Sequence, residues 1–236
     1  MSRIKLLSFD LDDTLWHTAP TIAKAEQVFY LHLQTAAPAL TAMFSPKALR
    51  EHRLQYLSAN PGLEHHISQW RLDSLNQALI ESGYGEQSQE LAAAAFDVFY
   101  QARQNVQLFE HCAKILAELS QDFLLISLTN GNADLSRLPI SQYFHSHYRA
   151  EQVGAAKPAA PLFLEALRQA DCLPHESIHI GDNINDDIAG AKAVGMHAIQ
   201  ARLIEHAPEP HPLADLHFDD WRDLPRLIQK LNSSTR

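Results

Sequence analysis

The chain has 236 residues, 46% of them hydrophobic and 20% charged, so it can bury a substantial core without disulfide or metal support. The formal net charge is −9 with no long basic run, which argues against a binder of the nucleic-acid backbone. The apolar stretches, such as residues 123–128, are far too short to cross a membrane. We therefore expect a globular protein without nucleic-acid or membrane partners, which must hold any small anion through local contacts.

Cysteine usage and the N-terminal residues bear on the compartment. The two cysteines, Cys112 and Cys172, have no metal-like spacing. Charges at Arg3, Lys5 and Asp10 interrupt the apolar core that a secretory signal peptide needs. Both observations favour a cytoplasmic protein, and the sequence leaves open whether it is a monomer or a homodimer.

The first strand organises the chain. Residues 4–15 read IKLLSFDLDDTL, an apolar run that stops at Asp10, Asp12 and Asp13. Such a run suits a buried central strand, and ligands of open α/β sheets bind beyond the carboxyl ends of the strands. Strand alternation would put Asp10 and Asp12 on one side and Asp13 on the other. Two close carboxylates repel unless a cation or a proton lies between them, which predicts a Mg²⁺ site, with a solvated acidic turn as the alternative.

A helical insertion follows this strand, from about residue 18 to residue 105. Apolar residues recur there at helical spacing in four segments, and Ser45 followed by Pro46 marks a helix start. Four helices with short connections predict an antiparallel bundle. We thus expect a core made of residues 1–17 and 106–236, with a four-helix insertion at 18–105.

Strand and helix patterns alternate again after the insertion. We expect strands over 122–128, 177–180, 197–201 and 215–218, the last at an edge, and helices over 161–170, 185–194 and 224–231. This alternation predicts an α/β fold whose core is a Rossmann-like parallel sheet with helices on both faces.

Polar residues follow each of the predicted central strands. Beyond the first strand and its acids, they are Thr129, Asn130, Asp182 and Asp187, and Lys157 precedes a helix between the second and third of these strands. The carboxyl ends of parallel strands meet at one edge of a sheet, so we expect all of them to converge on one crevice. Three of these features have plain alternatives: Thr129 as a turn cap, Lys157 as a solvated loop lysine, and residues 181–183 as a simple turn. Together, these alternatives would require a coincidence.

In this order the residues resemble the four motifs of the haloacid dehalogenase (HAD) superfamily. The motifs are D-x-D-x-T/V at 10–14, a strand-ending threonine at Thr129, a lysine at Lys157 and G-D-x-x-x-x-D at 181–187. The resemblance covers residues 4–201 and puts the helical insertion where this family carries its type 1 cap. It implies a phosphomonoester hydrolase in which Asp10 is a nucleophile that forms an aspartyl phosphate.

The resemblance also implies a metal site and a general acid. Mg²⁺ would be held by Asp10, by the backbone carbonyl of Asp12 and by Asp182, with Asp187 in support through water. Asp12 would protonate the leaving oxygen and then deprotonate the attacking water, so it must carry a proton when substrate binds.

The remaining motif residues would bind the substrate. Thr129, the backbone of Asn130 and Lys157 would hold the phosphoryl oxygens, and Lys157 would also offset the carboxylate charges. His17, at the junction with the insertion, is placed to touch substrate. We expect most other histidines at the surface, among them His65, His66, His145, His147, His206, His211 and His217.

Other activities remain open on sequence alone. They are dehalogenation of 2-haloacids, a sugar-phosphate phosphomutase and a receiver-like signalling module. Family dehalogenases lack the second Asp of D-x-D, so Asp12 favours a phosphoester, and the receiver fold lacks such an insertion.

The substrate is suggested by a narrower resemblance. Residues 68–79 (SQWRLDSLNQAL), LTNGN and the AAKP loop are similar to a bacterial branch of phosphatases. That branch acts on flavin mononucleotide (FMN) and on the riboflavin precursor 5-amino-6-(5-phosphoribitylamino)uracil. Trp70 and Arg71 could stack on a flat ring of this kind. The alternative is that Trp70 belongs to the bundle core and that Arg71 is a solvated charge.

Overall fold

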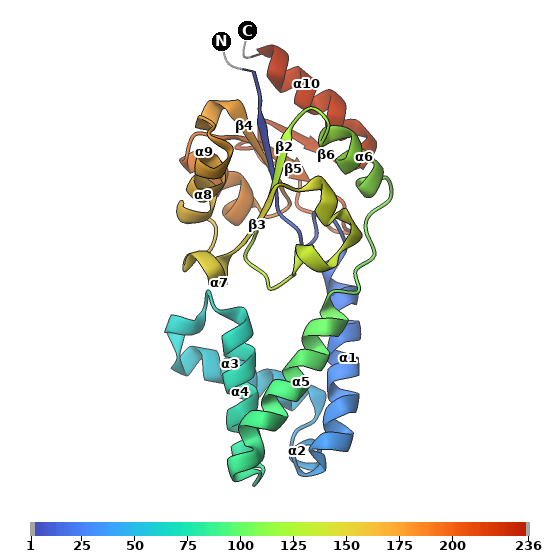
Figure 1. The fold of residues 1–236 in the computed structure, drawn as a ribbon, viewed down its shortest axis with the longest axis vertical. Coiled ribbons are helices and arrows are strands. Elements are labelled where there is room, and N and C mark those ends of the chain that lie inside the picture. Colours follow the sequence, from blue (N-terminus) through green and yellow to red (C-terminus); the bar gives the residue numbers. More distant parts are fainter. Residues whose placement is uncertain (1–2, 235–236) are drawn as a thin grey trace. The chain divides into compact units, whose positions relative to one another are not determined.

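The computed structural model describes residues 3–234, and the chain divides into two compact units (Figure 1). The first unit combines Met1–Thr18 with Gln107–Arg236, and the second is Ala19–Val106. Within the described residues, no helix is long and apolar enough to cross a membrane.

A six-stranded sheet forms the centre of the first unit, with the strand order β3-β2-β1-β4-β5-β6 and parallel pairing throughout. The strands are β1 (Leu6–Phe9), β2 (Leu124–Thr129), β3 (Ser146–Arg149), β4 (Ser177–Gly181), β5 (His197–Ala201) and β6 (Leu216–Phe218). The chain leaves β1 toward β2 on one side and later returns to β4 on the other, which is the topological switch of Rossmann-like sheets. The predicted α/β fold is confirmed.

Two details of the sheet differ from the expectation. The strand β3 was not predicted, because its residues Ser-His-Tyr-Arg are half-buried and polar at the sheet edge. The first strand ends at Phe9, and the chain then turns, with Leu15 N donating to Leu11 O at 2.8 Å and Asp13 at a φ of 60°. Strand alternation therefore does not orient Asp12 and Asp13.

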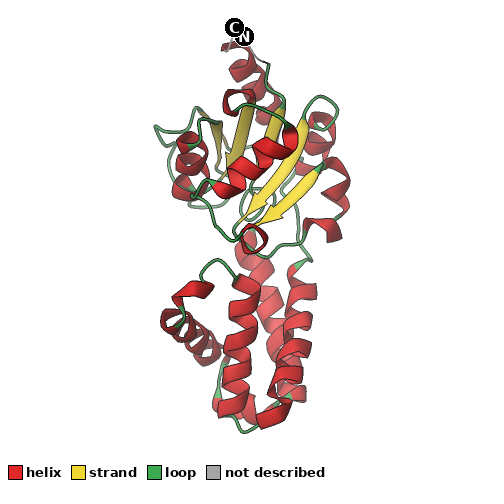
Figure 2. Cartoon of the chain, turned by 60° about the vertical axis from the view of Figure 1, so that its left-hand side comes forward, coloured by secondary structure: helices red, strands yellow, loops and turns green. Residues whose placement is uncertain are grey.

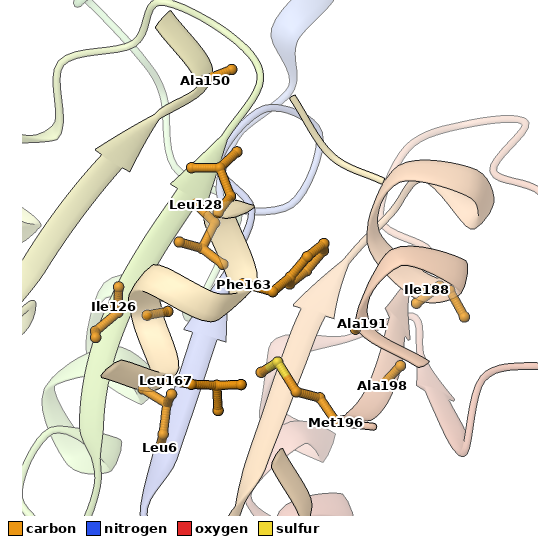
Figure 3. Close-up of a cluster of buried hydrophobic side chains, with 12 residues drawn as sticks. Leu6, Ile126, Leu128, Ala150, Phe163, Leu167, Ile188, Ala191, Met196 and Ala198 are labelled. Carbon is orange, nitrogen blue, oxygen red and sulfur yellow. The ribbon is translucent and has the colours of Figure 1, made fainter. Parts of the chain in front are cut away.

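Helices cover both faces of the sheet (Figures 1 and 2). They are α6 (Cys112–Leu119), α7 (Ala150–Val153), α8 (Pro161–Ala170), α9 (Gly190–Ala193) and α10 (Leu224–Ser234). On one face, Phe163 and Leu167 of α8 pack into a buried cluster with Leu6 and Ile126 of the central strands (Figure 3). On the other face, Phe9 stacks on Trp221 with ring centroids 6.1 Å apart.

The helix predicted over 185–194 is divided in two. A π-helix spans Ile184–Ala189 and α9 continues it. The Asn183 side chain caps its start by accepting from the backbone N–H groups of Asn185 and Asp186. The irregular turn places Asp187 in the buried interior.

The second unit is entirely helical. Its helices are α1 (Thr18–Ala36), α2 (Pro38–Met43), α3 (Pro46–Ala59), α4 (Ile67–Glu81) and α5 (Ser88–Arg103). Four of them correspond to the predicted helices, and α2 is a short addition that begins at Pro38, a proline that was not interpreted as a helix start. Ser45 is the N-cap of α3, with its side chain accepting from Ala48 N at 3.2 Å. Phe29, Leu75 and Phe99 lie in the core of this unit.

Candidate active site

The site residues follow three neighbouring strands at the same edge of the sheet. Asp10 directly follows β1, Thr129 ends β2 and Asp182 directly follows β4. Phe9 pairs with Ser127 on one side and with Ile180 on the other, so these strand ends lie at similar heights. The central position of β1 puts Asp10 between the other two.

Lys157 is the centre of the cluster. Its Nζ donates to Asp10 Oδ1 at 2.6 Å, to Asp187 Oδ1 at 2.6 Å and to Leu128 O at 2.8 Å, and the side chain is buried. These bonds use all three donors of an ammonium group. Burial lowers the pKa of Lys157, but the charges of Asp10 and Asp187 outweigh it and raise that pKa above its ordinary value. Lys157 is therefore a protonated bridge between carboxylates, and the solvated-lysine alternative is wrong.

Three carboxylates surround this lysine. Asp10, Asp182 and Asp187 each offer an oxygen, and these oxygens lie within 4.8 Å of one another. Burial raises the pKa of Asp10, and the charges of Asp187 and Asp182 add to that effect while Lys157 opposes it. Burial, then the charges of Asp187 and Asp13, raise the pKa of Asp182 to about 7. Three carboxylates and one lysine leave a formal surplus of two negative charges on oxygen ligands, which fits a hard divalent cation.

His179 is a member of the site that the sequence analysis missed. It is fully buried on β4, with Nδ1 2.8 Å from Ser8 Oγ and Nε2 3.2 Å from Asp187 Oδ1. Burial lowers the pKa of His179, so the ring is neutral, and the hydrogen-bond network assigns the proton to Nε2, which donates to Asp187. The signal was available, because Ser8 and His179 are polar residues inside two mostly apolar strands, and the strand register pairs them.

Asp187 is held from three directions. Besides Lys157 and His179, the backbone N–H of Asn183 donates to Asp187 Oδ2 at 2.9 Å. A Cβ on Gly181 would overlap the Asp187 carboxyl group, so the glycine makes room for it. Burial would raise the pKa of Asp187, but Lys157 and His179 outweigh burial and hold it below the ordinary range.

The Asn130 side chain binds the backbone of Lys157 on both sides. Asn130 Nδ2 donates to Lys157 O at 2.8 Å, and Lys157 N donates to Asn130 Oδ1 at 2.8 Å. Thr129 is buried, and its Oγ1 accepts from Gly131 N at 3.0 Å, so the turn-capping interpretation describes one of its contacts. The Asn130 side chain thus positions the lysine loop, a role that the sequence did not indicate.

The loop after Asp10 orients the second aspartate. Asp12 Oδ1 accepts from Trp16 Nε1 at 2.8 Å and from Thr18 Oγ1 at 2.9 Å, and Asp13 Oδ1 accepts from Thr18 N at 2.8 Å. The Asp12 carboxylate is not one of the three clustered acids, and its metal contact through the backbone carbonyl stays a prediction. His17 is exposed beside this loop, and its contact with substrate also stays a prediction.

One histidine expected at the surface lies elsewhere. His147 is half-buried on β3, with Nδ1 2.7 Å from Ser127 Oγ and Nε2 3.2 Å from Ala133 O. It connects β2 to the loop that follows Thr129. The expectation of a surface histidine was wrong here, because the unpredicted strand β3 places this side chain against β2.

The parallel sheet brings together the acids and the lysine of the motifs that carry the family resemblance. The chain matches the family model of haloacid dehalogenase-like hydrolases over residues 4–195, and it therefore belongs to that family. The resemblance inferred from the motifs is confirmed.

The chain is similar to particular phosphatases along its length. It is 31% identical to the Escherichia coli protein 5-amino-6-(5-phospho-D-ribitylamino)uracil phosphatase YigB, over 100% of this chain and 96% of the relative. It is also 31% identical to a phosphoserine phosphatase of Thermus thermophilus, over 94% of this chain and 98% of that protein. The family match and these relatives confirm the predicted enzyme class, a hydrolase of the phosphatase type.

Among solved structures, the chain is similar to one named 2-haloacid dehalogenase, from Pseudomonas syringae pv. tomato. The identity is 39% and the TM-score is 0.90, with 96% of this chain and 99% of that chain covered. The fold is thus shared with a protein whose name gives another activity.

Proposed function

We propose that this protein is a Mg²⁺-dependent phosphomonoester hydrolase that works through an aspartyl-phosphate intermediate. The observation that carries the proposal is the buried cluster of Lys157 with Asp10, Asp182 and Asp187. Its formal surplus of two negative charges would be costly in a buried site, and a divalent cation offsets it. The relatives named as phosphatases support the same reaction.

Asp10 is the proposed nucleophile. Lys157 fixes Asp10 Oδ1, so we assign the attack on phosphorus to Oδ2, with the alkoxide of the substrate as the leaving group. The attack requires the ionised carboxylate; burial raises the pKa of Asp10, and the charge of Lys157 opposes that shift. When bound, Mg²⁺ would offset the phosphate charge and favour the ionised forms of the neighbouring acids.

The other residues hold the phosphoryl group and transfer protons. Asp12, held by Trp16 and Thr18, gives its proton to the leaving oxygen and later takes one from the water that hydrolyses the aspartyl phosphate. The Thr129 hydroxyl and the backbone N–H of Asn130 bind phosphoryl oxygens. Lys157 acts mainly through its charge and its bond to Asp10, because its three donors already have acceptors.

Hydrolysis of 2-haloacids is a second candidate, favoured by the 39% identity to the structure named 2-haloacid dehalogenase. Two features of this chain favour the phosphoester instead. A halide leaves as a stable anion without a proton, whereas an alkoxide needs a general acid such as Asp12. Attack of Asp10 on the carbon of a 2-haloacid would also not explain the formal surplus of two negative charges around Lys157.

One assay separates these reactions. The same preparation is given phosphomonoesters and 2-chloropropionate, with Mg²⁺ or with EDTA, and the release of phosphate and of halide is measured. We expect phosphate release that EDTA abolishes and Mg²⁺ restores. Halide release that is faster and insensitive to EDTA would overturn the proposal. Transfer of phosphate between sugar hydroxyls, seen as a rearranged product, would indicate a phosphomutase.

For the substrate we propose FMN or 5-amino-6-(5-phosphoribitylamino)uracil. The similarity to the phosphatase YigB along the whole chain supports this choice. Trp70 and Arg71 do not, because Trp70 Nε1 donates to Arg53 O at 2.8 Å and the Arg71 guanidinium lies 3.9 Å from the Phe99 ring centroid. Arg71 is also ion-paired with Glu26, so the alternative of a solvated charge is wrong.

A metabolite panel tests the substrate. FMN, the riboflavin precursor, phosphoserine, glyceraldehyde 3-phosphate and sugar phosphates are compared by kcat/KM with Mg²⁺. We expect the first two to be hydrolysed fastest. A panel in which both fall in the lowest tier would remove this substrate and leave the phosphatase assignment intact.

We also propose that the helical unit, residues 18–105, serves as the type 1 cap and selects substrates. Within the first unit, the chain segments that lead into and out of the helical unit pair through the bridge between Trp16 and Leu108 and through Phe109 N, which donates to Leu15 O at 2.9 Å. A cap that excludes water favours substrates large enough to fill the enclosed space. Equal kcat/KM for acetyl phosphate and for FMN would argue against selection by the cap.

The predicted cytoplasmic location and the choice between monomer and homodimer stay predictions.

A further inference from the structure

A second ionic cluster lies in the helical unit, and the proposed reaction does not use it. Glu26 Oε1, on α1, accepts from Arg53 Nη2 of α3 and from Arg71 Nη1 of α4, both at 2.8 Å. The side chains of Arg53 and Arg71 are only 13% and 14% exposed. Two guanidinium groups that share one carboxylate oxygen carry a formal surplus of one positive charge, in a chain whose net charge is −9.

The positive charges of Arg53 and Arg71 are crowded, and this affects the pKa of Arg71. Burial, followed by the charge of Arg53, lowers the pKa of Arg71 to about 10, although Glu26 opposes the shift. Like charges in a poorly solvated place repel more strongly than in water, and a nearby anion relieves that repulsion. The cluster therefore favours an additional negative group close to the two guanidinium groups.

A groove between α1 and α3 leads to this cluster. It has a volume of about 580 Å³, within the range of small-molecule sites. Its apolar wall includes Phe29, Tyr30, Leu31 and Leu49. Its charged lining is basic in sum, with Lys47, Arg50 and Arg53 against Glu26.

Arg53 connects the groove to the interior of the bundle. A smaller inner cavity of about 20 Å³, enough for one water, is lined by Phe29, Leu49, Arg53 and Arg71 among others. Since Arg53 lines both spaces, an anion in the groove can bond the outer side of the cluster without entering the bundle core. An apolar wall next to a basic one suits a molecule with the matching two parts.

We propose that the groove between α1 and α3 binds a small amphipathic anion. The apolar part of this molecule, a ring system or a short alkyl chain, packs on Phe29, Tyr30 and Leu31. Its carboxylate or phosphate bonds Arg53 and Arg50. All of these residues belong to the helical unit, so the groove is a binding site additional to the acid–lysine cluster at the strand ends.

The test uses the full-length protein and 1-anilinonaphthalene-8-sulfonate, whose fluorescence rises when its rings leave water. We expect saturable binding of one probe per chain, weakened by salt. Octanoate and octyl phosphate should displace it and thereby compare the two anionic groups, whereas neutral octanol should displace it weakly. Absence of saturable binding would overturn the proposal, and so would displacement by inorganic phosphate at concentrations that saturate the phosphatase.

Matched variants locate the probe. Arg50→Glu changes the groove lining, and Lys24→Glu makes the same charge change at an exposed position of α1 outside it. We expect about a tenfold rise of the dissociation constant for Arg50→Glu and little change for Lys24→Glu, since a direct charge contact is lost only in the first. Leu31→Glu and the control Leu54→Glu, both at exposed leucines, test the apolar wall in the same way. Equal effects within each pair would overturn the proposal.

Two controls concern the folding and the oligomeric state of the variants. Phosphatase turnover should be unchanged in Arg50→Glu, and the thermal unfolding of all four variants checks that binding is measured on folded protein. Light scattering follows the oligomeric state with concentration. A dimer of the wild type that Arg50→Glu dissociates would assign the groove to a second copy of the chain and overturn the proposal of a small anion.

Discussion

The two units contain ionic clusters of opposite composition. At the strand ends, one lysine lies among Asp10, Asp182 and Asp187, whereas in the helical bundle one glutamate lies between Arg53 and Arg71. The formal surplus is −2 in the first cluster and +1 in the second. Because surplus charge is costly where water is scarce, its sign predicts the sign of the ligand: a divalent cation in one unit and an anion in the other.

The two clusters also differ in how they are held. Asp187 and Lys157 are almost completely buried, and their positions depend on strand ends and on backbone contacts. The arginines reach Glu26 on long side chains, and the Glu26 side chain is 31% exposed. The rigidly held acid–lysine cluster suits chemistry that needs fixed geometry. The cluster around Glu26 suits a ligand of less defined shape.

The largest effect is expected at Asp10. Asp10→Asn keeps the shape of the side chain but removes the nucleophile, so turnover should fall by about four orders of magnitude or more. The measurement is kcat with Mg²⁺ and FMN. Since the substitution also lowers the negative surplus from −2 to −1, the folded protein should remain at least as stable in the absence of metal. Undiminished hydrolysis would contradict the covalent mechanism.

Removal of the central lysine tests whether the cluster of the first unit depends on its one cation. Lys157→Met leaves the buried carboxylates without their shared partner, which should reduce the free energy of unfolding by about 3 to 5 kcal/mol. In the folded fraction, kcat/KM should fall by an amount that corresponds to a loss of about 2 to 4 kcal/mol of transition-state stabilisation.

Lys192→Met is the matched control for the lysine. Lys192 pairs with Asp215 at 2.9 Å near the surface, so its removal should cost less than about 1 kcal/mol and leave kcat/KM unchanged. Urea unfolding measures the free energy of unfolding, and steady-state kinetics measure kcat/KM. Equal destabilisation by the two variants would show that the buried cluster is not special.

Asp182→Asn tests the link between surplus charge and metal. The substitution removes one negative charge from the proposed ligands, and we expect Mg²⁺ affinity to fall by about 10- to 100-fold. Calorimetric titration of Mg²⁺ measures the affinity without reference to turnover. Asp186→Asn, an acid outside the cluster of three, is the control and should bind Mg²⁺ normally. An unchanged affinity in Asp182→Asn would place the cation elsewhere.

The smallest effect is expected in the helical unit. Glu26→Gln removes the only carboxylate between Arg53 and Arg71 that the hydrogen bonds of the described residues show, and it raises the surplus from +1 to +2. We expect a loss of about 1 to 2 kcal/mol in unfolding free energy, reduced by partial exposure of the pair. Sulfate should restore more stability to this variant than to the wild type. An equal gain of stability from sulfate in the variant and in the wild type would remove the contrast between the two clusters.

The sequence by itself determined the α/β class and the identity of the acids and the lysine at the strand ends. A buried parallel strand reads as an apolar run, and ligand groups follow its carboxyl end, so both signals are local. The same holds for the Ser45 cap of α3, whose contact spans three residues.

Only the tertiary structure decided which partners these residues have. Lys157 meets Asp10 from 147 positions away, and Arg71 meets Glu26 from 45 positions away. Ser8 finds His179 because the sheet register aligns them, and no local pattern encodes that register. Burial then converts ordinary side chains into a charged bridge, a neutral histidine and a shared carboxylate, because the cost of an unpaired charge depends on the water around it.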